Sequence, residues 1–513
     1  MYQLHKVSFL AQSKAIGLSV ILAGQVFLTG CQPDSQQAKV EAEAEAEAIS
    51  TPNILFIYTD DQAPWAMGAA GNNQAFTPNM DKLAKQGMRL PNAYTTTPVC
   101  SPSRAGLMTS RYGYELGIDD WINTHYGKFG LNPLEPELGL DPNLETWPEV
   151  LQRAGYYTGL IGKWHLGITD QHHPTQQGYS EFNGFRSGGT TPQNPKLEIA
   201  GQEVKEQGLT ADVLTQYAIK FLNENKDRKF ALSLHYRAPH TRWLPVAPED
   251  EAPYKNLDLT IPNPDYPNLD VKRVKRYMAE YLSSVRSVDR NLGLILQQLD
   301  TLGLSDNTLV IFTSDHGYNM GHNGIWHKGN GHWILKDKVA AKSHNLPADQ
   351  RPNMYDNSIK VPTIVRWPNK IAANSVNLSS VSNLDWFPTL VAAANTQASQ
   401  QTIIRGNNVL PVLTGKKALS SSDYYAAYTT KHQSISGMRM YSDGQYKLVK
   451  DYINKGRDEF YDLGNDPQES TNLINTNNPK LQVIINRFDD VIFEKMLATQ
   501  DPLLDQFFAE KKK

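Results

Sequence analysis

Four short, mostly apolar runs recur along the chain, and polar side chains capable of chemistry follow each of them. The runs cover residues 53–58, 157–162, 230–236 and 308–313. Runs of this length and composition predict strands buried on both faces, as in parallel sheets covered by helices. Because ligands bind beyond the carboxyl ends of the strands in such sheets, we expect the four polar clusters to converge on one site.

Helical patterns lie between these runs. A helix is predicted over 78–85, with Thr77 as its N-cap and Pro78 at its first position, and another over 146–154. The segment 274–302 has the apolar periodicity of a long amphipathic helix, as expected of a crossover packed on a parallel sheet. Alternation of such strands and helices predicts an α/β fold.

The pattern changes from about Gly406 onward. Short strand-like stretches at 438–441 and 446–449 replace the long alternation, and a terminal helix is predicted over 480–496. We interpret residues 406–513 as a smaller α+β subdomain packed on the first domain.

The first 31 residues have the organisation of a bacterial secretion signal. Two lysines precede an apolar run, which ends in Leu28-Thr29-Gly30-Cys31. This ending resembles the lipobox of bacterial lipoproteins, which implies cleavage before Cys31 and lipidation of its sulfur. Gln32 follows where an Asp would favour the inner membrane, so we expect export and a lipid anchor in the outer membrane of a Gram-negative bacterium.

The run after Cys31 is polar and acidic and contains a Glu-Ala repeat, which is typical of a disordered tether. The expected organisation therefore has four parts. These are a signal peptide with lipobox over 1–31, a tether over 32–50, a catalytic domain over 51–405 and the C-terminal subdomain over 406–513.

Charge and cysteine content narrow the function. The formal net charge is -3, with no basic block of the kind that neutralises nucleic-acid phosphates, so we expect no nucleic-acid partner. The chain has two cysteines, and lipidation of Cys31 leaves Cys100 alone in the folded part. An intramolecular disulfide is then impossible, so a chemical role is the better explanation of Cys100.

The segment around Cys100 gives the strongest functional indication. Cys100-Ser101-Pro102-Ser103-Arg104, followed by Ala105 to Tyr112, resembles the signature of the formylglycine-dependent type I sulfatases. The resemblance extends over most of Pro52 to about Asn395, and more loosely over the C-terminal part. It implies an alkaline-phosphatase-like α/β sandwich with a large central mixed, mostly parallel sheet and a smaller C-terminal α+β subdomain.

In that family a formylglycine-generating enzyme oxidises the cysteine before folding, and an oxygen of the hydrated aldehyde attacks sulfur. Covalent catalysis of this kind splits one difficult hydrolysis into two easier steps, and a geminal diol can expel sulfate by reforming its carbonyl. Pro102 and Ser103 suit the start of a helix, whose N-terminus favours an anion. The resemblance implies that Arg104 holds the modified side chain.

Acidic residues at two predicted strand ends form the candidate metal site. Asp60, Asp61 and Asp315 offer the carboxylate oxygens that Ca²⁺ prefers, and the resemblance implies that they bind a divalent ion with His316 and the modified Cys100. The family more often has Asn at the position of His316. Since an imidazole nitrogen also suits Mn²⁺ or Zn²⁺, these ions are alternatives to the expected Ca²⁺.

Basic residues in further matching motifs complete the candidate site. The resemblance implies that Lys163 binds sulfate, that His165 takes a proton from the diol, and that His240 and Lys328 contact the sulfate and help protonate the leaving alcohol. Imidazole suits proton transfer because it titrates near neutral pH. The candidate catalytic residues are Cys100, Arg104, Lys163, His165, His240 and Lys328.

Several residues near these motifs are candidates for binding substrate. They are His235, which is also a candidate support for the site, and Arg237 and Arg242, with the nearby indoles of Trp243, Trp326 and Trp333. Arginines and indoles bind an anionic sugar by charge and ring stacking, but they serve equally as packing residues. Lys328 falls in a long loop, 321–344, which precedes a strand-like stretch at 359–362.

The expected function is hydrolysis of sulfate esters on a polysaccharide or its oligosaccharides. Bacterial enzymes of this type act on algal galactans such as carrageenan, on ulvan, or on glycosaminoglycans. A phosphomonoester or phosphonate hydrolase of the same fold is one alternative, since fold alone does not separate these reactions. A carbohydrate-binding surface lipoprotein with an inactive site is the other.

Overall fold

The structure is a computed structural model that describes residues 51–124, 134–341, 343–417 and 422–505. The predictions of a lipobox at Cys31 and of a tether over 32–50 lie outside the described residues. Within the described residues, no helix has both the length and the apolar character needed to span a membrane.

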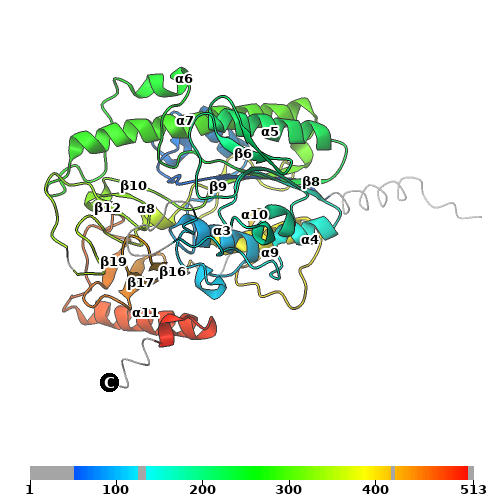
Figure 1. Ribbon diagram of the computed structural model, residues 1–513. Helices are drawn as coiled ribbons and strands as arrows, with labels where there is room; N and C mark the ends of the chain where they lie inside the picture. Colours follow the sequence, from blue (N-terminus) through cyan, green and yellow to red (C-terminus); the bar gives the residue numbers. More distant parts are fainter. Residues whose placement is uncertain (1–50, 125–133, 342, 418–421, 506–513) are drawn as a thin grey trace, which may run out of the picture. The chain divides into compact units, whose positions relative to one another are not determined.

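A ten-stranded mixed sheet forms the centre of the described chain (Figure 1). Its order is β14-β2-β13-β9-β1-β8-β4-β5-β6-β7, and the run from β9 to β5 is parallel throughout. The strands are β1 (Asn53–Thr59), β2 (Met88–Arg89), β4 (Tyr157–Lys163), β5 (Glu181–Phe185), β6 (Lys196–Ile199), β7 (Gln202–Lys205), β8 (Phe230–His235), β9 (Thr308–Ser314), β13 (Ile364–Arg366) and β14 (Ser375–Val376). The four predicted strands are confirmed as β1, β4, β8 and β9.

Helices cover both faces of this sheet, which explains the unbroken apolar runs. Leu55 and Ile57 of β1 pack in one core cluster with α2, α5 and α7, whereas Ile54 and Phe56 pack on the opposite face with α4 and α9. Figure 1 shows α5 and α7 over one face and α3, α4 and α9 over the other. The helices are α2 (Pro78–Gln86), α3 (Cys100–Thr109), α4 (Trp147–Arg153), α5 (Thr210–Asn225), α7 (Val271–Thr301) and α9 (Trp386–Ala393).

Helix α7 is the predicted crossover between β8 and β9. It begins three residues earlier than the sequence predicted, because the side chain of Asp270 accepts a hydrogen bond from the backbone N–H of Arg273 and caps the helix. Val274, Tyr281 and Leu292 lie on its buried face. Each such side chain contributes about 1.5–3 kcal/mol when fully buried, so the helix is held to the sheet chiefly by this face.

A second, antiparallel sheet lies in the C-terminal part. Its strands β16 (Tyr424–Thr430), β17 (Ser436–Ser442), β18 (Tyr446–Asp451) and β19 (Glu459–Asp462) pair in sequence order. Helix α11 (Pro479–Ala498) packs on it through Phe488, Ile492 and Met496, which confirms the predicted terminal helix. The short helix α10 (Leu410–Leu413) packs instead with the core cluster of α9.

Two local predictions between residues 321 and 362 are wrong. The stretch 359–362 is not a strand, because α8 (Asp356–Ile359) runs into it and Pro362 lacks the N–H that a ladder needs; the strand β13 begins only at Ile364. The segment 321–344 is not a plain loop either. It contains β11 (Ile325–His327) and β12 (His332–Trp333), which pair beside β10 (Asn319–Met320) and present Lys328 at a turn.

Candidate active site

The polar clusters converge at the carboxyl ends of the parallel strands, as the sequence predicted. Asp60 and Asp61 follow β1, His165 follows β4, and Asp315 follows β9. They surround Cys100 at the first turn of α3. A cavity of about 350 Å³ opens above Cys100, and its wall is formed by Cys100, Trp121, Ile122, Thr124, His165, Gly188, Gly189, Thr190, Arg237, His240, Thr241, His327, Lys328, Asn330 and Gln433.

Cys100 lies at the bottom of this cavity and is only 2% exposed. Its sulfur is 3.0 Å from Lys328 Nζ and 3.5 Å from both Asp60 Oδ1 and His316 Nε2. Burial raises the pKa of the Cys100 thiol to about 12. A thiol with that pKa is almost entirely protonated at neutral pH, so the unmodified side chain is a poor nucleophile.

Two buried ion pairs hold the acidic residues. Lys163 Nζ lies 2.7 Å from Asp60 Oδ2, and Lys328 Nζ lies 2.7 Å from Asp61 Oδ1. Burial by itself opposes ionisation, but Lys163 holds the pKa of Asp60, and Lys328 that of Asp61, well below the usual range. Both carboxylates are therefore ionised and available as ligands.

The donor atoms of Asp60, Asp61, Cys100 and His316 lie within 4.8 Å of one another. His316 Nδ1 is 2.9 Å from the carbonyl oxygen of Gly317, which only accepts, so Nδ1 carries the proton and the Nε2 lone pair faces Asp61 Oδ1 at 3.1 Å. Burial lowers the pKa of His316, which disfavours a second proton. Lys328 Nζ, at 2.7 Å, balances the charge of Asp61 Oδ1. The oxygen, nitrogen and sulfur atoms of this buried group are of the types that bind divalent metal ions, so the group fits such an ion.

Asp315 lies beside this group, with its Oδ1 at 3.4 Å from His316 Nε2. Its Oδ2 accepts from Arg104 Nη2 at 2.9 Å and Nε at 3.1 Å, and its Oδ1 accepts from the backbone N–H of Asp61 at 3.1 Å. Its role as a metal ligand stays a prediction. Arg104 Nη1 also donates to the carbonyl oxygen of Lys163 at 3.2 Å, so Arg104 joins the ends of β4 and β9.

His165 has the protonation state that a base needs. Its Nε2 is 3.1 Å from the carbonyl oxygen of Ile122 and therefore carries the proton, while Nδ1 has no hydrogen-bond partner among the described residues. Burial, together with the charge of Lys163, holds the pKa of His165 well below its usual value. Gly188 approaches this ring so closely that a Cβ there would lie 2.5 Å from His165 Nε2.

Of the two candidate histidines that follow one another near the end of β8, only His240 lines the cavity above Cys100. His240 lines the cavity, with Nε2 at 3.9 Å from Asp61 Oδ2, and burial lowers its pKa to about 4. His235 is 2% exposed and does not line the cavity. Its Nδ1 instead lies 3.1 Å from the carbonyl oxygen of Lys163 and 3.4 Å from Arg104 Nη1, so this candidate substrate-binding residue supports Arg104 from behind.

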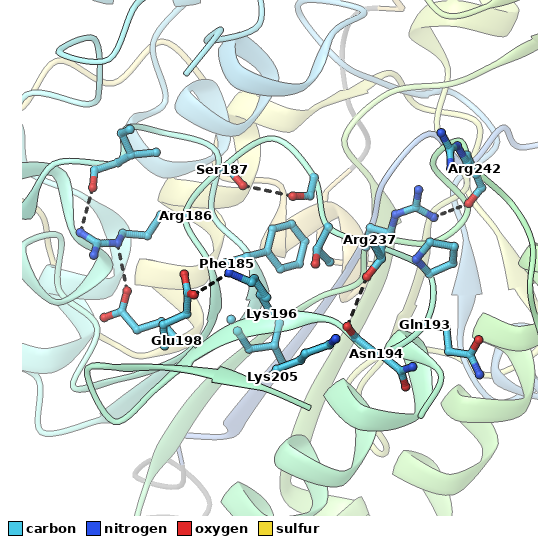
Figure 2. Close-up of a pocket in the computed structure, with 18 of the residues that line it drawn as sticks. Phe185, Arg186, Ser187, Gln193, Asn194, Lys196, Glu198, Lys205, Arg237 and Arg242 are labelled. Carbon is cyan, nitrogen blue, oxygen red and sulfur yellow. Dashed lines mark hydrogen bonds and ion pairs between the residues drawn. The ribbon is translucent and has the colours of Figure 1, made fainter. Parts of the chain in front are cut away.

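Of the remaining candidates for substrate binding, some line a cavity and others are buried. Arg237 lines both the cavity above Cys100 and a larger one of about 1150 Å³, and Arg242 lines the larger one (Figure 2). Trp243 is buried, so its ring is not open for stacking on a sugar. The face of Trp326 that packs against Trp243 is closed in the same way. Trp333 lines a separate cavity of about 150 Å³.

Several residues of the cavity wall were not predicted from the sequence. Trp121, Ile122 and Thr124 come from a loop after α3, and Gln433 comes from the turn between β16 and β17. Gln433 Oε1 accepts a hydrogen bond of 2.9 Å from Asn330 Nδ2, which ties the C-terminal sheet to the rim. None of these residues belongs to a motif, and only their folded positions identify them.

Comparison with known proteins gives two family matches. Residues 52–396 match the family model described as Sulfatase, and residues 348–496 match the one described as N-sulphoglucosamine sulphohydrolase, C-terminal. Among curated proteins, N-acetylglucosamine-6-O-sulfatase of Bacteroides thetaiotaomicron is 26% identical over 516 residues, covering 84% of each chain.

Two solved structures are also similar over most of the chain. One, in complex with its substrate D-glucosamine-2-N,6-O-disulfate, has a TM-score of 0.74 at 24% identity, covering 88% of this chain and 99% of that one. The other, in complex with κ-ι-κ-neocarrahexaose, has a TM-score of 0.68 at 25% identity, covering 89% and 99%. The similarity therefore extends over both sheets.

Proposed function

The chain belongs to the sulfatase family of sulfuric ester hydrolases, and on that premise we propose that it removes sulfate esters from a sulfated carbohydrate through a formylglycine made from Cys100. The observation that carries this proposal is the position of Cys100. It lies at the N-terminus of α3, with Lys328 at 3.0 Å and a metal-binding group of carboxylates and imidazole around it. An anionic sulfate is stabilised at such a helix terminus.

The neutral thiol of Cys100 supports the modification. Buried as it is, the thiol supplies no thiolate, whereas a hydrated formylglycine at the same position supplies one hydroxyl for attack on sulfur and a second for expulsion of sulfate. When the second hydroxyl loses its proton, the carbonyl reforms, the bond between the side-chain carbon of residue 100 and the sulfate ester oxygen breaks, and sulfate leaves with that oxygen. Water then restores the diol.

We propose that His165, His240 and Lys328, which all line the cavity above Cys100, carry out the proton transfers. The unprotonated Nδ1 of the neutral His165 suits it to take a proton from the diol hydroxyl. The ammonium group of Lys328, on the cavity wall, suits donation to the sulfate oxygens and the leaving sugar oxygen. His240 is neutral in the structure, and we propose that a bound sulfate raises its pKa so that it can donate a proton to the leaving oxygen. Lys163 and Arg104 hold Asp60 and Asp315 in place.

We propose Ca²⁺ as the metal, held by Asp60, Asp61, Asp315, His316 and the modified residue 100. Carboxylate oxygens favour a hard cation, while the imidazole of His316 keeps Mn²⁺ and Zn²⁺ as alternatives. Such an ion supplies positive charge that polarises sulfate oxygens and favours the ionised hydroxyl.

The proteins that this chain resembles support carbohydrate sulfates as its substrates. These proteins include an N-acetylglucosamine-6-O-sulfatase, a structure with bound glucosamine disulfate and one with a bound carrageenan oligosaccharide. We further propose that the protein is exported and anchored through a lipid on Cys31 at the outer membrane, with the lipobox-like sequence as its support.

A substrate panel tests the function. Purified enzyme is incubated with sulfated hexosamines, carrageenan and ulvan oligosaccharides, glycosaminoglycan oligosaccharides, and matched phosphate and phosphonate esters. Free sulfate and free phosphate are measured, with product mass to locate the bond. Sulfate release from a sugar supports the proposal. Preferred release of phosphate or phosphonate, or binding of sulfated sugar without turnover, overturns it in favour of a related hydrolase or an inactive binding protein.

A further inference from the structure

The larger cavity adjoins the cavity above Cys100. The two share Gly189, Thr190, Arg237 and Thr241 as wall residues. Cavities that bind small molecules measure about 300–1,000 Å³. At about 350 Å³ the cavity above Cys100 has the size for one small ligand unit, whereas at about 1150 Å³ its neighbour exceeds the usual range for one.

The wall of this larger cavity is built from two sides. Figure 2 shows Arg237 and Arg242, which follow β8, on one side and Lys196 and Glu198, from the β6–β7 hairpin at the sheet edge, on the other. Lys205 of β7 also lines it. Of the twenty residues that line it, thirteen are charged or polar, and five of these are arginines or lysines, which suits a hydrated anionic ligand.

Positive charge predominates in this wall after the internal ion pairs are formed. Arg186 pairs with Glu198 at 2.9 Å, and Lys196 pairs with Glu203 at 2.9 Å, which occupies both acidic residues of the wall. In the described parts of the chain, no carboxylate lies within ion-pair distance of Lys205 or Arg242. Two exposed cations therefore remain available to an anion.

We propose that this cavity binds the neighbouring residues of an anionic oligosaccharide whose sulfated unit occupies the cavity above Cys100, and that Lys205 and Arg242 contact a second sulfate or carboxylate group on it. The inference rests on the proposed function and extends it, since it makes the preferred substrate an oligomer with charge on more than one residue. Gly189, Thr190 and Arg237 line both cavities, so neighbouring units of one oligosaccharide would meet beside them.

The test compares three substrates that carry the same sulfated terminal unit. One is the monosaccharide, one is a tetrasaccharide with neutral neighbouring residues, and one is a tetrasaccharide with a sulfate or uronate on those residues. The wild type should give its highest kcat/KM with the anionic tetrasaccharide, and raising the salt to about 0.5 M should reduce that preference. Lys205→Gln and Arg242→Gln should each lower the ratio of kcat/KM for the anionic over the neutral tetrasaccharide about threefold to fivefold.

Lys226→Gln is the matched control, because Lys226 is an exposed lysine on the far end of α5 that lines neither cavity. It should leave the ratio at its wild-type value, and thermal unfolding should verify that all three variants fold. Equal kcat/KM for the two tetrasaccharides in the wild type, or an unaltered ratio in Lys205→Gln and Arg242→Gln, would overturn the inference.

Calorimetric titration of the anionic tetrasaccharide distinguishes this failure from failure of the proposed function. If the wild type releases no sulfate but binds the tetrasaccharide in a salt-dependent manner that Lys205→Gln and Arg242→Gln weaken, the binding site stands and the proposed reaction fails. If titration detects neither binding nor an effect of the variants, the site assignment is wrong.

Discussion

The ammonium nitrogen of Lys328 lies 3.0 Å from the sulfur of Cys100. The same nitrogen lies 2.7 Å from Asp61 Oδ1, so one buried cation contacts both the proposed nucleophile position and a carboxylate of the metal-binding group. Substitutions at this position and around it separate the contributions of charge, metal and covalent chemistry.

Cys100→Ala and Cys100→Ser should abolish sulfate release while the protein still folds. Loss of one small side chain at the start of α3 should cost at most about 1–3 kcal/mol of stability, whereas no nucleophile remains. Activity and urea unfolding measure the two effects. Peptide mass spectrometry of active wild type should show residue 100 lighter than cysteine by about 18 Da, as expected for an aldehyde in place of the thiol. Full activity with an unmodified thiol would exclude the mechanism.

Removal of divalent ions should abolish activity, and Ca²⁺ should restore it. Calcium should also stabilise the fold by about 2.7 kcal/mol at a free concentration of 100 times its Kd. Denaturant midpoints with and without chelator check this independently of turnover. His316→Asn keeps an oxygen donor and should retain the calcium response, whereas His316→Ala should weaken it. Restoration by Mn²⁺ or Zn²⁺ but not by Ca²⁺ would correct the identity of the ion.

Lys328→Met should destabilise the metal-free protein more than the calcium-loaded protein. Without metal, Lys328 is the cation in contact with Asp61, and an uncompensated buried charge costs about 3–5 kcal/mol. With calcium bound, the ion itself neutralises the carboxylate. Urea unfolding of wild type and variant in both states gives the difference. A loss of stability of the same size in both states would show that Lys328 and the metal do not share Asp61.

Gly188→Ala should lower kcat about 10- to 100-fold with little change in stability, because an ångström-scale displacement of a catalytic group costs that much. The added Cβ would lie 2.5 Å from His165 Nε2 and force the imidazole to move. Gly189→Ala is the adjacent control, since its Cβ would meet nothing within 4 Å. Steady-state kinetics on a sulfated monosaccharide should show a much smaller effect for the control, and equal effects would refute the steric explanation.

His432 should make stability depend on pH. Its Nε2 lies 2.7 Å from the carbonyl oxygen of Trp121 and 3.2 Å from Glu135 Oε2. Burial lowers its pKa, but the hydrogen bond to Glu135 and the charge of Asp120 outweigh burial and raise it above 6.5. A raised folded-state pKa stabilises the fold at low pH, and this contribution is lost as the pH rises through the folded-state value.

His432→Gln should therefore reduce the free energy of unfolding more at about pH 5.5 than at about pH 8.5. The difference should amount to about 1.5–3 kcal/mol, as for a hydrogen bond to a charged group. Urea unfolding at both pH values measures it. A loss of equal size at the two values would show that His432 contributes only as a neutral hydrogen-bond donor.

Local sequence signals predicted the central fold well, and they predicted that the candidate site residues would converge at the strand ends. Asp60 and Asp61 come directly after the apolar run of β1 in the chain. The run that predicts the buried strand therefore also predicts that these two residues lie at its carboxyl end. The hairpin of β6 and β7 was missed because β7 is exposed throughout and lacks an apolar face. Ala200 and Gly201, both with positive φ, form its two-residue turn, and that turn is a signal the sequence contains.

The wall of the cavity was not predictable in the same way. Ile122 and Gln433 reach it from a loop and from the C-terminal sheet, and their positions depend on how separate elements pack. Asp315 was expected to bind metal because it follows a predicted strand and matches the sulfatase metal motif, and this stays a prediction. Its ion pair with Arg104 is a tertiary contact with no trace in the local sequence.

The burial of Cys100 beneath residues from distant parts of the chain has a consequence for the order of biosynthetic events. Gln433 joins the rim through Asn330 only after the last sheet has been made. At about 5–20 residues per second, synthesis from Cys100 to Gln433 takes on the order of tens of seconds. An enzyme that modifies Cys100 must bind the extended segment within that interval, or keep the chain open beyond it, because a thiol only 2% exposed in the completed fold is closed to another protein.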